Sequence, residues 1–420
     1  MRFPNKMTDW IKWAGALLGI ALIAACGGGG GGSSNGGSPS SAAGPSQSLA
    51  ANAVAVTVDS GLERFANIPV VTVTVCAPGT SNCQTIDHVL LDTKSFGLRL
   101  VNTSLGALAS SLTPLASGSG QLAQCTLFAD GFTWGTIRGA DVRIAGETAS
   151  NIPIQVIGDL PAGSTPVTNC SDRGTTAENT TAELGANGIL GIGVAPVDCG
   201  AACAAPIGTN NPSTYFSCPP GTTTNNCTRT SVPVAQQSAN PVARFATDNN
   251  GLVVQFPAIA DAGVKSVTGT MTFGINTQTN NAMPTTVTKL GSTGFGDLVK
   301  STFNGVSNVD AFLDTGSNGL FFTASVAACG AQALHFYCPT SQQAFSATLQ
   351  GSDSTQAAVS FNASNAVTLF NSGNFAFNNL AGPNGSAVML DLGLPFYFGR
   401  TVYHGLDQTA SGGQSAFLAF

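Results

Sequence analysis

Two acidic turns with nearly the same sequence stand far apart in this chain. Asp92 begins the phrase Asp-Thr-Lys-Ser and Asp314 begins the phrase Asp-Thr-Gly-Ser, and each follows a leucine that closes an apolar stretch. Two such turns brought together would place two carboxylates side by side, and neighbouring aspartates can share one proton. Because a proton-sharing pair can activate a water molecule, the sequence predicts hydrolytic chemistry near an amide bond.

Both aspartates are predicted to lie at the end of a strand. Residues 68–75 alternate apolar and polar positions, and residues 85–91 form a second strand that ends directly before the first aspartate, which indicates a hairpin. The second half repeats this arrangement, with strands expected at 270–275 and 309–313. Aspartate also begins ordinary surface turns, where it bonds only the local backbone. The repeated strand context favours a pair of functional turns over that alternative.

Composition favours a β protein. At 420 residues the chain is long enough for two lobes that each bury a core. Only 9% of residues are charged, while Gly (51) and Pro (21) are abundant, which favours strands and turns over long helices. We expect an all-β fold with an N-terminal β lobe at 53–265 and a C-terminal β lobe at 266–420. The net charge of −6 provides no electrostatic footprint for nucleic acid, so nucleic acid is excluded as a partner.

The N-terminus has the pattern of an export signal. Basic residues precede an apolar run at 13–25, which is too short for a comfortable membrane span. The run ends in Ala-Ala-Cys26, which resembles a bacterial lipobox and predicts a signal peptide at 1–25 with lipidation of Cys26. An ordinary secretory signal with an incidental cysteine is the alternative. Gly27 follows the cysteine, which points to the outer membrane, and a Gly- and Ser-rich flexible tether is expected at 26–52.

Ten of the eleven cysteines remain after the lipobox cysteine is set aside. An even number in an exported chain predicts disulfides. Sequence alone does not fix the pairing, but short loops favour Cys76 with Cys83, Cys199 with Cys203, Cys218 with Cys227 and Cys329 with Cys338, which leaves Cys125 for Cys170. Cysteine clusters can also bind zinc, but these spacings fit no zinc pattern, so no metal is expected.

Three further segments are informative. Residues 125–128 and 132–134 are apolar stretches on either side of Ala-Asp-Gly, which is a strong hairpin signal. Residues 196–241 are rich in Cys, Pro, Asn and Thr and predict a surface excursion pinned by disulfides. Residues 390–403 are expected to form a core strand.

Taken together, these residues resemble the pepsin-like aspartic proteases, which are bilobal all-β enzymes with one Asp-Thr-Gly-Ser or Asp-Thr-Gly-Thr turn in each lobe. The resemblance covers most of the mature chain and implies pseudo-twofold lobes. It makes Asp92 and Asp314 the catalytic pair. It also implies that the threonines of the two turns cross-brace them and that the serines bond the outer carboxylate oxygens. The residues assigned to support the pair are Thr93, Ser95, Thr315, Gly316 and Ser317.

The resemblance extends to segments outside the turns. Ile-Leu-Gly at 189–191 is similar to the segment that supports the first turn, and Leu-Gly at 392–393, followed by Pro-Phe-Tyr, is similar to its counterpart for the second. The hairpin after residue 125 is placed like the flap that closes over substrate. The flap residues are Phe128, Asp130, Gly131 and Trp134.

The implied activity is cleavage of peptide bonds by a water held between the two aspartates, without a cofactor. The expected partner is a peptide or protein bound in a cleft between the lobes. A closer resemblance is to an uncharacterised family of Gram-negative bacterial lipoproteins with paired Asp-Thr-Gly-Ser turns and a Gly-Leu-Pro-Phe ending. The expected location is therefore the outer membrane, through the lipid anchor.

Two departures from the family pattern bear on activity. Lys94 stands where the pattern has glycine, and Phe128 stands where the flap usually has tyrosine. A lysine adds a Cβ atom and a cation beside the pair, and a cation favours loss of the shared proton. Lys94 is therefore expected to weaken activity. Two functional classes result: an exported aspartic endopeptidase, and a catalytically silent member of the fold that acts as a surface binding or scaffold protein.

Overall fold

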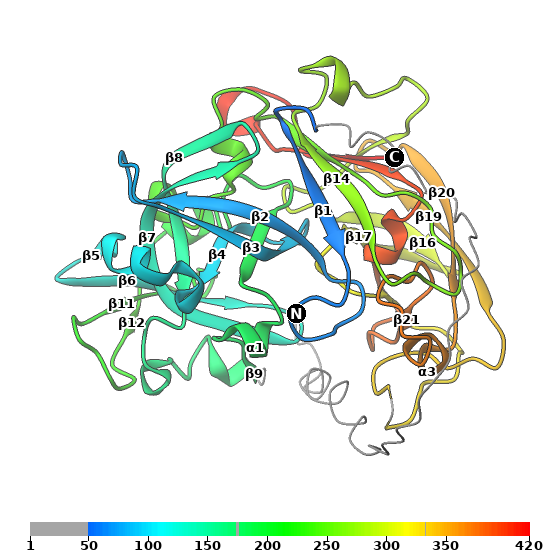
Figure 1. Cartoon of the computed structure of the whole chain (residues 1–420), viewed down its shortest axis with the longest axis horizontal. Coiled ribbons are helices and arrows are strands. Elements are labelled where there is room, and N and C mark those ends of the chain that lie inside the picture. Colours follow the sequence, from blue (N-terminus) through cyan, green and yellow to red (C-terminus); the bar gives the residue numbers. More distant parts are fainter. Residues whose placement is uncertain (1–48, 174–175, 332) are drawn as a thin grey trace, which may run out of the picture.

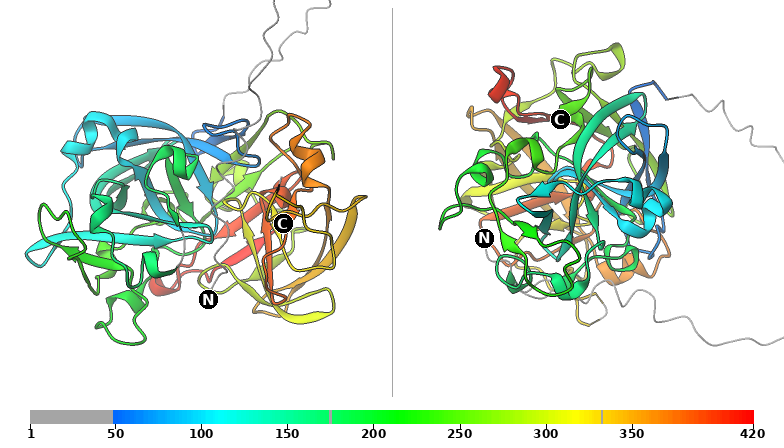
Figure 2. Two further views of the ribbon diagram at one scale, coloured as in Figure 1. Left: turned by 90° about the horizontal axis from the view of Figure 1, so that it is seen from below. Right: turned by 90° about the vertical axis from the view of Figure 1, so that its left-hand side faces the viewer.

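The computed structural model describes residues 49–173, 176–331 and 333–420. These residues form an all-β protein with two lobes, which lie side by side in the left view of Figure 2. The expected all-β, bilobal architecture is confirmed. The predicted signal peptide at 1–25, Cys26 and the tether up to residue 48 lie outside the described residues.

The N-terminal lobe is built on an antiparallel hairpin that ends at the first aspartate. Strands β2 and β3 pair from Val70 with Leu90 to Cys76 with Cys83, as the alternating sequence predicted. The strands of this lobe are β2 (Pro69–Cys76), β3 (Cys83–Asp92), β4 (Phe96–Val101), β5 (Ala116–Ser117), β6 (Gly120–Leu127), β7 (Gly131–Ile144), β8 (Glu147–Ile157), β9 (Thr176–Ala177), β10 (Gly188–Ile192), β11 (Tyr215–Cys218) and β12 (Thr228–Arg229).

The C-terminal lobe contains a second sheet, whose order among the described residues is β20-β19-β16-β17-β22-β18-β21. Its strands are β16 (Leu298–Phe303), β17 (Val306–Asp314), β18 (Leu320–Phe321), β19 (Gln343–Gln350), β20 (Gln356–Ala363), β21 (Ala381–Gly382) and β22 (Met389–Gly393). The hairpin partner of β17 is β16. The expectation that residues 270–275 would form the hairpin partner of β17 was wrong. Residues 298–303 take this position, and the sequence did not reveal them because they contain fewer apolar residues.

A third set of strands joins the lobes. These strands pair in the order β1-β14-β13-β23-β24-β15, all antiparallel. They are β1 (Ala53–Val58), β13 (Gly251–Gln255), β14 (Val267–Phe273), β15 (Lys289–Gly291), β23 (Thr401–Gly405) and β24 (Phe417–Ala419). In Figure 2 (left) the red C-terminal strands lie between the two lobes. Residues 270–273 therefore belong to the sheet that positions the lobes relative to each other.

Helices in the described residues are short: α1 (Thr181–Leu184), α2 (Ala201–Ala204) and α3 (Ala366–Phe370), with 3-10 segments such as η1 (Asn102–Ser111) and η7 (Leu394–Tyr397). Segment η7 divides the single strand expected at 390–403, because Pro395 lacks the amide proton that a strand ladder needs. Within the part of the chain that the structure describes, no helix has the length and apolarity needed to cross a membrane.

All five expected disulfides form, with the expected pairing. Four of them close loops of fewer than ten residues, and short loops are the cheapest to close. Disulfides pin the segment 196–241 as predicted, but the segment is not confined to the surface. Strand β11 in this segment pairs with β6, and Tyr215 and Phe216 are buried. Because the segment is mostly polar, the sequence did not indicate that these two aromatic residues belong to the core.

Candidate active site

Two strands end at an aspartate whose carboxylate is held by the following turn. Strand β3 ends at Asp92, whose Oδ1 accepts hydrogen bonds from the backbone amides of Lys94 (2.8 Å) and Ser95 (2.9 Å). Strand β17 ends at Asp314, whose Oδ1 accepts a hydrogen bond from the amide of Gly316 (2.8 Å). The two turns therefore orient their carboxylates in the same way.

The two carboxylates border the same small volume. A Cβ atom built on Gly316 would lie 3.1 Å from Oδ1 of Asp92 and 3.1 Å from Oδ1 of Asp314. Both oxygens therefore lie next to the same glycine, so the two carboxyl groups are neighbours. Residue 316 has to be glycine because a Cβ atom there would also lie 2.8 Å from the carboxyl carbon of Asp92. No side chain fits at residue 316.

The electrostatics of the site favour retention of a proton. Burial, together with the negative charge of Asp92, raises the pKa of Asp314 to about 7, against the opposing effect of hydrogen bonds from Ser317 and Gly316. Two adjacent carboxylates titrate as a unit, so this proton belongs to the pair. The site can therefore hold one shared proton at acidic to neutral pH, as acid and base catalysis by two aspartates requires.

The threonines of the two turns brace the lobes against each other. Thr93 donates from Oγ1 to the carbonyl of Leu313 (3.1 Å) and accepts from the amide of Thr315 (3.0 Å). Thr315 donates from Oγ1 to the carbonyl of Leu91 (2.7 Å). Both threonines are buried. Each of these bonds runs from one lobe to the other, so they fix the distance between the aspartates.

A buried tyrosine and histidine extend this brace, and sequence reasoning missed the histidine. The hydroxyl of Tyr397 lies 3.1 Å from Oγ1 of Thr93 and 3.1 Å from Nε2 of His404. Burial lowers the pKa of His404 to about 3, so the imidazole is neutral and can exchange hydrogen bonds with the tyrosine. The Pro-Phe-Tyr signal marked Tyr397, but nothing in the sequence linked it to a histidine in β23.

Strands β10 and β22 support the two turns in matching ways. Strand β10 runs parallel to β3 and places Gly191 beside Asp92, while β22 runs parallel to β17 and places Gly393 beside Asp314. Each supporting strand also pairs antiparallel with the strand after the turn, β4 or β18. The predicted placement of both supporting segments is confirmed.

The two serines differ. The Ser317 hydroxyl donates to Oδ2 of Asp314 at 2.7 Å, as expected. The buried Ser95 hydroxyl has no hydrogen-bond partner among the described residues, and Ser95 contacts Asp92 through its backbone amide. The expectation that the Ser95 hydroxyl bonds the outer oxygen of Asp92 was therefore wrong. A further carboxylate that the sequence did not single out, Asp391, lies 2.6 Å from the Ser317 hydroxyl.

The ammonium group of Lys94 has its partners in the opposite lobe. Its ammonium group forms an ion pair with Asp297 and donates to the carbonyl of Phe295 at 2.8 Å. It also lies 5.0 Å from the ring centre of Phe312. The backbone amide of Lys94 still bonds Asp92, as the glycine amide does in the second turn. The long side chain thus pairs with the opposite lobe. Its charge still opposes the raised pKa of Asp314, but burial and Asp92 outweigh it.

The predicted flap is a hairpin between β6 and β7, closed by a hydrogen bond from the amide of Phe128 to the carbonyl of Gly131 (2.8 Å). Burial raises the pKa of Asp130, and the negative charge of Asp92 adds to this effect. The tip of the hairpin is therefore within electrostatic reach of the carboxylate pair. A Cβ atom at Gly131 would lie 2.3 Å from the carboxyl group of Glu178, so a larger residue there would have to displace that side chain.

Trp134 lies on the flap strand but faces the core. It is fully buried, donates from Nε1 to the hydroxyl of Ser164 (3.0 Å), and packs edge-on against Phe216. Trp134 therefore anchors the base of the hairpin and is not placed to touch a ligand.

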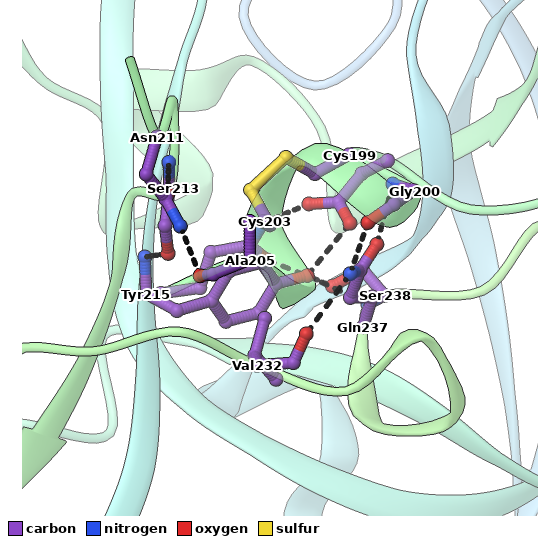
Figure 3. Close-up of a disulfide and its surroundings, with 12 residues drawn as sticks. Cys199, Gly200, Cys203, Ala205, Asn211, Ser213, Tyr215, Val232, Gln237 and Ser238 are labelled. Carbon is purple, nitrogen blue, oxygen red and sulfur yellow. Dashed lines mark hydrogen bonds between the residues drawn. A yellow bond between two sulfur atoms is a disulfide. The ribbon is translucent and has the colours of Figure 1, made fainter. Parts of the chain in front are cut away.

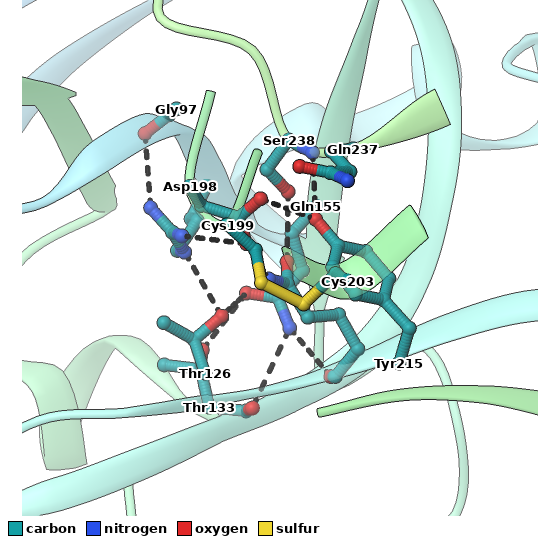
Figure 4. A network of polar contacts seen from close by, with 12 residues as sticks. Gly97, Thr126, Thr133, Gln155, Asp198, Cys199, Cys203, Tyr215, Gln237 and Ser238 are labelled. Atoms are coloured by element: carbon teal, nitrogen blue, oxygen red, sulfur yellow. Dashed lines mark hydrogen bonds and ion pairs between the residues drawn. A yellow bond between two sulfur atoms is a disulfide. The ribbon is translucent and has the colours of Figure 1, made fainter. Parts of the chain in front are cut away.

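A buried polar network lies behind the flap, and sequence reasoning missed it (Figure 4). Asp198 accepts hydrogen bonds from the Tyr215 hydroxyl (2.7 Å) and from the side-chain amide of Gln124. The guanidinium of Arg99, which is 1% exposed, lies 4.0 Å from Oδ2 of Asp198. It also donates to the Thr126 hydroxyl (3.0 Å). The network connects β4, which follows the first turn, to the flap strand β6.

The Cys199–Cys203 disulfide holds the segment that carries Asp198 (Figure 3). Beside it, the amide of Gly200 donates to Oε1 of Gln237 (2.6 Å), and Nε2 of Gln237 donates back to the Gly200 carbonyl (2.7 Å). Figure 3 shows the tyrosine of the network, Tyr215, below this disulfide. Asp198 directly precedes Cys199 in the sequence. The disulfide and the paired hydrogen bonds of Gly200 and Gln237 therefore hold the backbone beside Asp198 in place.

Comparisons with known proteins identify a family but no function. A family model described as "Protein of unknown function (DUF3443)" matches residues 48–420. A search of curated proteins found no match. Among solved structures, the chain is similar to the crystal structure of aspartic proteinase from Irpex lacteus, with 16% identity, a TM-score of 0.46, and coverage of 87% of this chain and 97% of that chain. The chemistry of this chain therefore has to be inferred from its own residues.

Proposed function

The chain belongs to the DUF3443 family of proteins of unknown function, and we propose that it is an exported, lipid-anchored aspartic-protease-like protein that cuts peptide bonds. One observation carries this proposal: Oδ1 of Asp92 and Oδ1 of Asp314 would both lie 3.1 Å from a Cβ atom on Gly316, so the two carboxyl groups are neighbours, and each is oriented by backbone amides. Two carboxylates in this arrangement suit the activation of a water molecule better than a structural role.

In the proposed mechanism, a water molecule lies between Asp92 and Asp314, which share one proton. The ionised carboxylate takes a proton from the water as its oxygen attacks the peptide carbonyl. The other carboxyl group donates its proton to the developing oxyanion, which gives a tetrahedral diol. The carboxyl group that took the water proton then donates it to the leaving amine as the C–N bond breaks, and the other carboxyl group regains a proton from a hydroxyl of the diol. No covalent intermediate with the protein forms. The flap hairpin would cover an extended peptide bound between the lobes.

A digestion experiment tests this function. The purified mature protein is incubated with a peptide library across about pH 3 to 8, a range set by the titration of paired carboxylates, and the products are identified by mass spectrometry. We expect cleavage that is inhibited by pepstatin and that declines above neutral pH, because the pair then loses its shared proton. Absence of any pepstatin-sensitive cleavage over the whole range would rule out the peptidase.

A binding or scaffold protein is the second candidate. It is favoured by the residues that depart from the protease pattern, Lys94 and Phe128, and by the lack of a hydroxyl bond from Ser95 to Asp92. A silent member of the fold would retain a peptide without cutting it. Mass-spectrometric recovery of intact bound peptides from the same library distinguishes this candidate from the enzyme.

Export and lipid anchoring are part of the proposal. Five disulfides support an oxidising compartment, and Ala-Ala-Cys26 supports lipidation. Replacement of Cys26 by serine is expected to release the protein from the outer-membrane fraction or to leave the signal uncut, as seen by fractionation and intact mass. Wild-type protein found free in the periplasm without a lipid would contradict the anchor.

A further inference from the structure

The Ser317 hydroxyl lies between two carboxylates. Its Oγ is 2.7 Å from Oδ2 of Asp314 and 2.6 Å from Oδ2 of Asp391. A serine hydroxyl has one proton and can donate it to only one of these oxygens. At such a short distance the other contact also needs a proton, so one of the two carboxyl groups must be protonated and donate to Ser317.

Asp391 is the group placed to keep that proton. It is 7% exposed and lies in β22 between Leu390 and Leu392, which are fully buried. Its Oδ1 has no hydrogen-bond partner in the part of the chain that the structure describes. An ionised carboxylate would leave this oxygen both charged and unsolvated, which is costly.

On balance, the surroundings of Asp391 raise its pKa. Burial raises its pKa well above the ordinary value for aspartate, the negative charge of Asp314 raises it further, and Asp92 adds to this. The hydrogen bond from Ser317 and the charge of Lys94 oppose the shift. Tyr397, on the 3-10 segment that follows β22, is uncharged because its own pKa is also raised, first by burial.

The first lobe shows that the fold does not require a carboxylate here. Asp391 precedes Leu392-Gly393 as Ile189 precedes Leu190-Gly191, and the pairing registers of β22 and β10 make the two positions equivalent. Ile189 is 2% exposed. In that lobe the serine hydroxyl has no partner among the described residues, whereas in the second lobe it has two. An apolar side chain therefore fills this position without loss of the strand.

We propose that Asp391 is a positioning residue for the carboxylate pair: a protonated carboxyl group that donates to Ser317 and thereby makes Ser317 donate to Asp314. This inference rests on the proposed function, which it deepens by adding a third carboxyl group to the regulation of the site. When Asp391 ionises, it accepts the serine proton and Asp314 loses its donor. Catalysis on the alkaline side then depends on two protons, the shared one and the one on Asp391.

Two matched variants test the inference in the full mature protein. Asp391→Asn keeps a donor to Ser317 but cannot ionise, so its kcat/KM at acidic pH should lie above that of the second variant, Asp391→Ile. The fall of its kcat/KM at alkaline pH should follow the loss of one proton, whereas that of the wild type should follow the loss of two. Asp391→Ile copies the first lobe and removes the donor. It should fold, with kcat about tenfold lower and KM unchanged, as loss of one hydrogen bond predicts.

The outcome is decided by these profiles. An alkaline limb with the same proton number in the wild type and Asp391→Asn, or wild-type kcat in a folded Asp391→Ile, would overturn the inference. Partial rescue by asparagine but not by isoleucine supports it, because a packing role would be satisfied by either side chain.

A readout that needs no activity separates this inference from the proposed function. The Asp391 carboxyl carbon is observed by carbon-13 NMR in aspartate-labelled protein and assigned by its absence from Asp391→Asn. A carboxyl group that stays protonated at neutral pH supports the inference even in a protein that cuts no peptide, and in that case only the proposed function fails. Ionisation near the ordinary aspartate value of about 4, in an active enzyme, overturns the inference alone.

Discussion

Replacement of Asp314 by asparagine is expected to abolish peptidase activity and to make the protein more stable at neutral pH. Activity is lost because asparagine can neither take a proton from water nor share one with Asp92. Removal of a group that acts as acid or base typically costs about 10²- to 10⁴-fold in rate. The side chains are nearly the same size, so the brace through Thr93 and Thr315 is expected to remain.

The gain in stability follows from the raised pKa of Asp314. In the unfolded chain its pKa is near 3.8, and in the folded protein burial and Asp92 raise it to about 7. The stability that this group contributes is fully present below 3.8 and is lost as the pH rises through about 7, because the unfolded state ionises first. Asparagine removes this penalty. The melting temperature of Asp314→Asn should therefore exceed that of the wild type at about pH 8 and match it more closely at about pH 4.

Two controls make this result specific. Asp92→Asn removes the other carboxylate and should be equally inactive. Glu63→Gln neutralises an exposed carboxylate and should change neither activity nor the pH dependence of melting. Pepstatin-sensitive cleavage at the wild-type rate in Asp314→Asn would refute the assignment of the pair. A variant that is less stable than the wild type at about pH 8 would refute the electrostatic argument.

The parts of the site that the sequence predicted are those set by local order. A strand followed by Asp-Thr-x-Ser places its aspartate at the strand end, whatever the rest of the lobe does. Short loops likewise keep Cys218 and Cys329 close to their partners. Asp391 could not be recognised, because a single acidic residue in an apolar segment is also typical of an exposed strand edge. Its role depends on the parallel pairing of β22 with β17, which brings it to Ser317.

Lys94 shows a different limit of sequence reasoning. Comparison of the two turns assumed that their third positions are equally crowded, since the phrases match. A Cβ atom at Gly316 would lie against both carboxylates, whereas Lys94 carries a side chain that reaches Asp297 in a loop of the second half of the chain. Equivalent positions in a repeated motif thus have different surroundings, and the residue type alone does not reveal which one is crowded.

Replacement of Arg99 by methionine is expected to be the most destabilising of the changes considered for the network behind the flap. Methionine retains much of the apolar stem but removes the charge beside Asp198 and the hydrogen bonds to Gly97 (3.1 Å) and Thr126 (3.0 Å). Removal of one partner from a buried ion pair typically costs about 3 to 5 kcal/mol. Chemical denaturation at about pH 8 measures the loss.

The size of this loss should depend on pH. Burial raises the pKa of Asp198 to about 6, and Arg99 opposes that rise. The stability from Asp198 is present below its unfolded pKa of 3.8 and is lost as the pH rises through about 6 in the wild type. Without Arg99 the folded pKa is higher still, so the variant loses stability over a longer pH range. The gap between wild type and Arg99→Met should therefore widen from about pH 5 to about pH 8.

A double variant separates charge from packing. Asp198→Asn combined with Arg99→Met removes the unpaired carboxylate, while the amide oxygen can still accept a hydrogen bond from the Tyr215 hydroxyl. It should recover part of the lost stability at about pH 8 and lose the pH dependence. A gap between wild type and Arg99→Met that is constant with pH would instead place the cost in the lost bonds to Thr126 and Gly97. In either case the flap is affected, because Phe128 lies over the guanidinium at 5.9 Å, and a peptidase whose flap loses this support should bind its peptides more weakly.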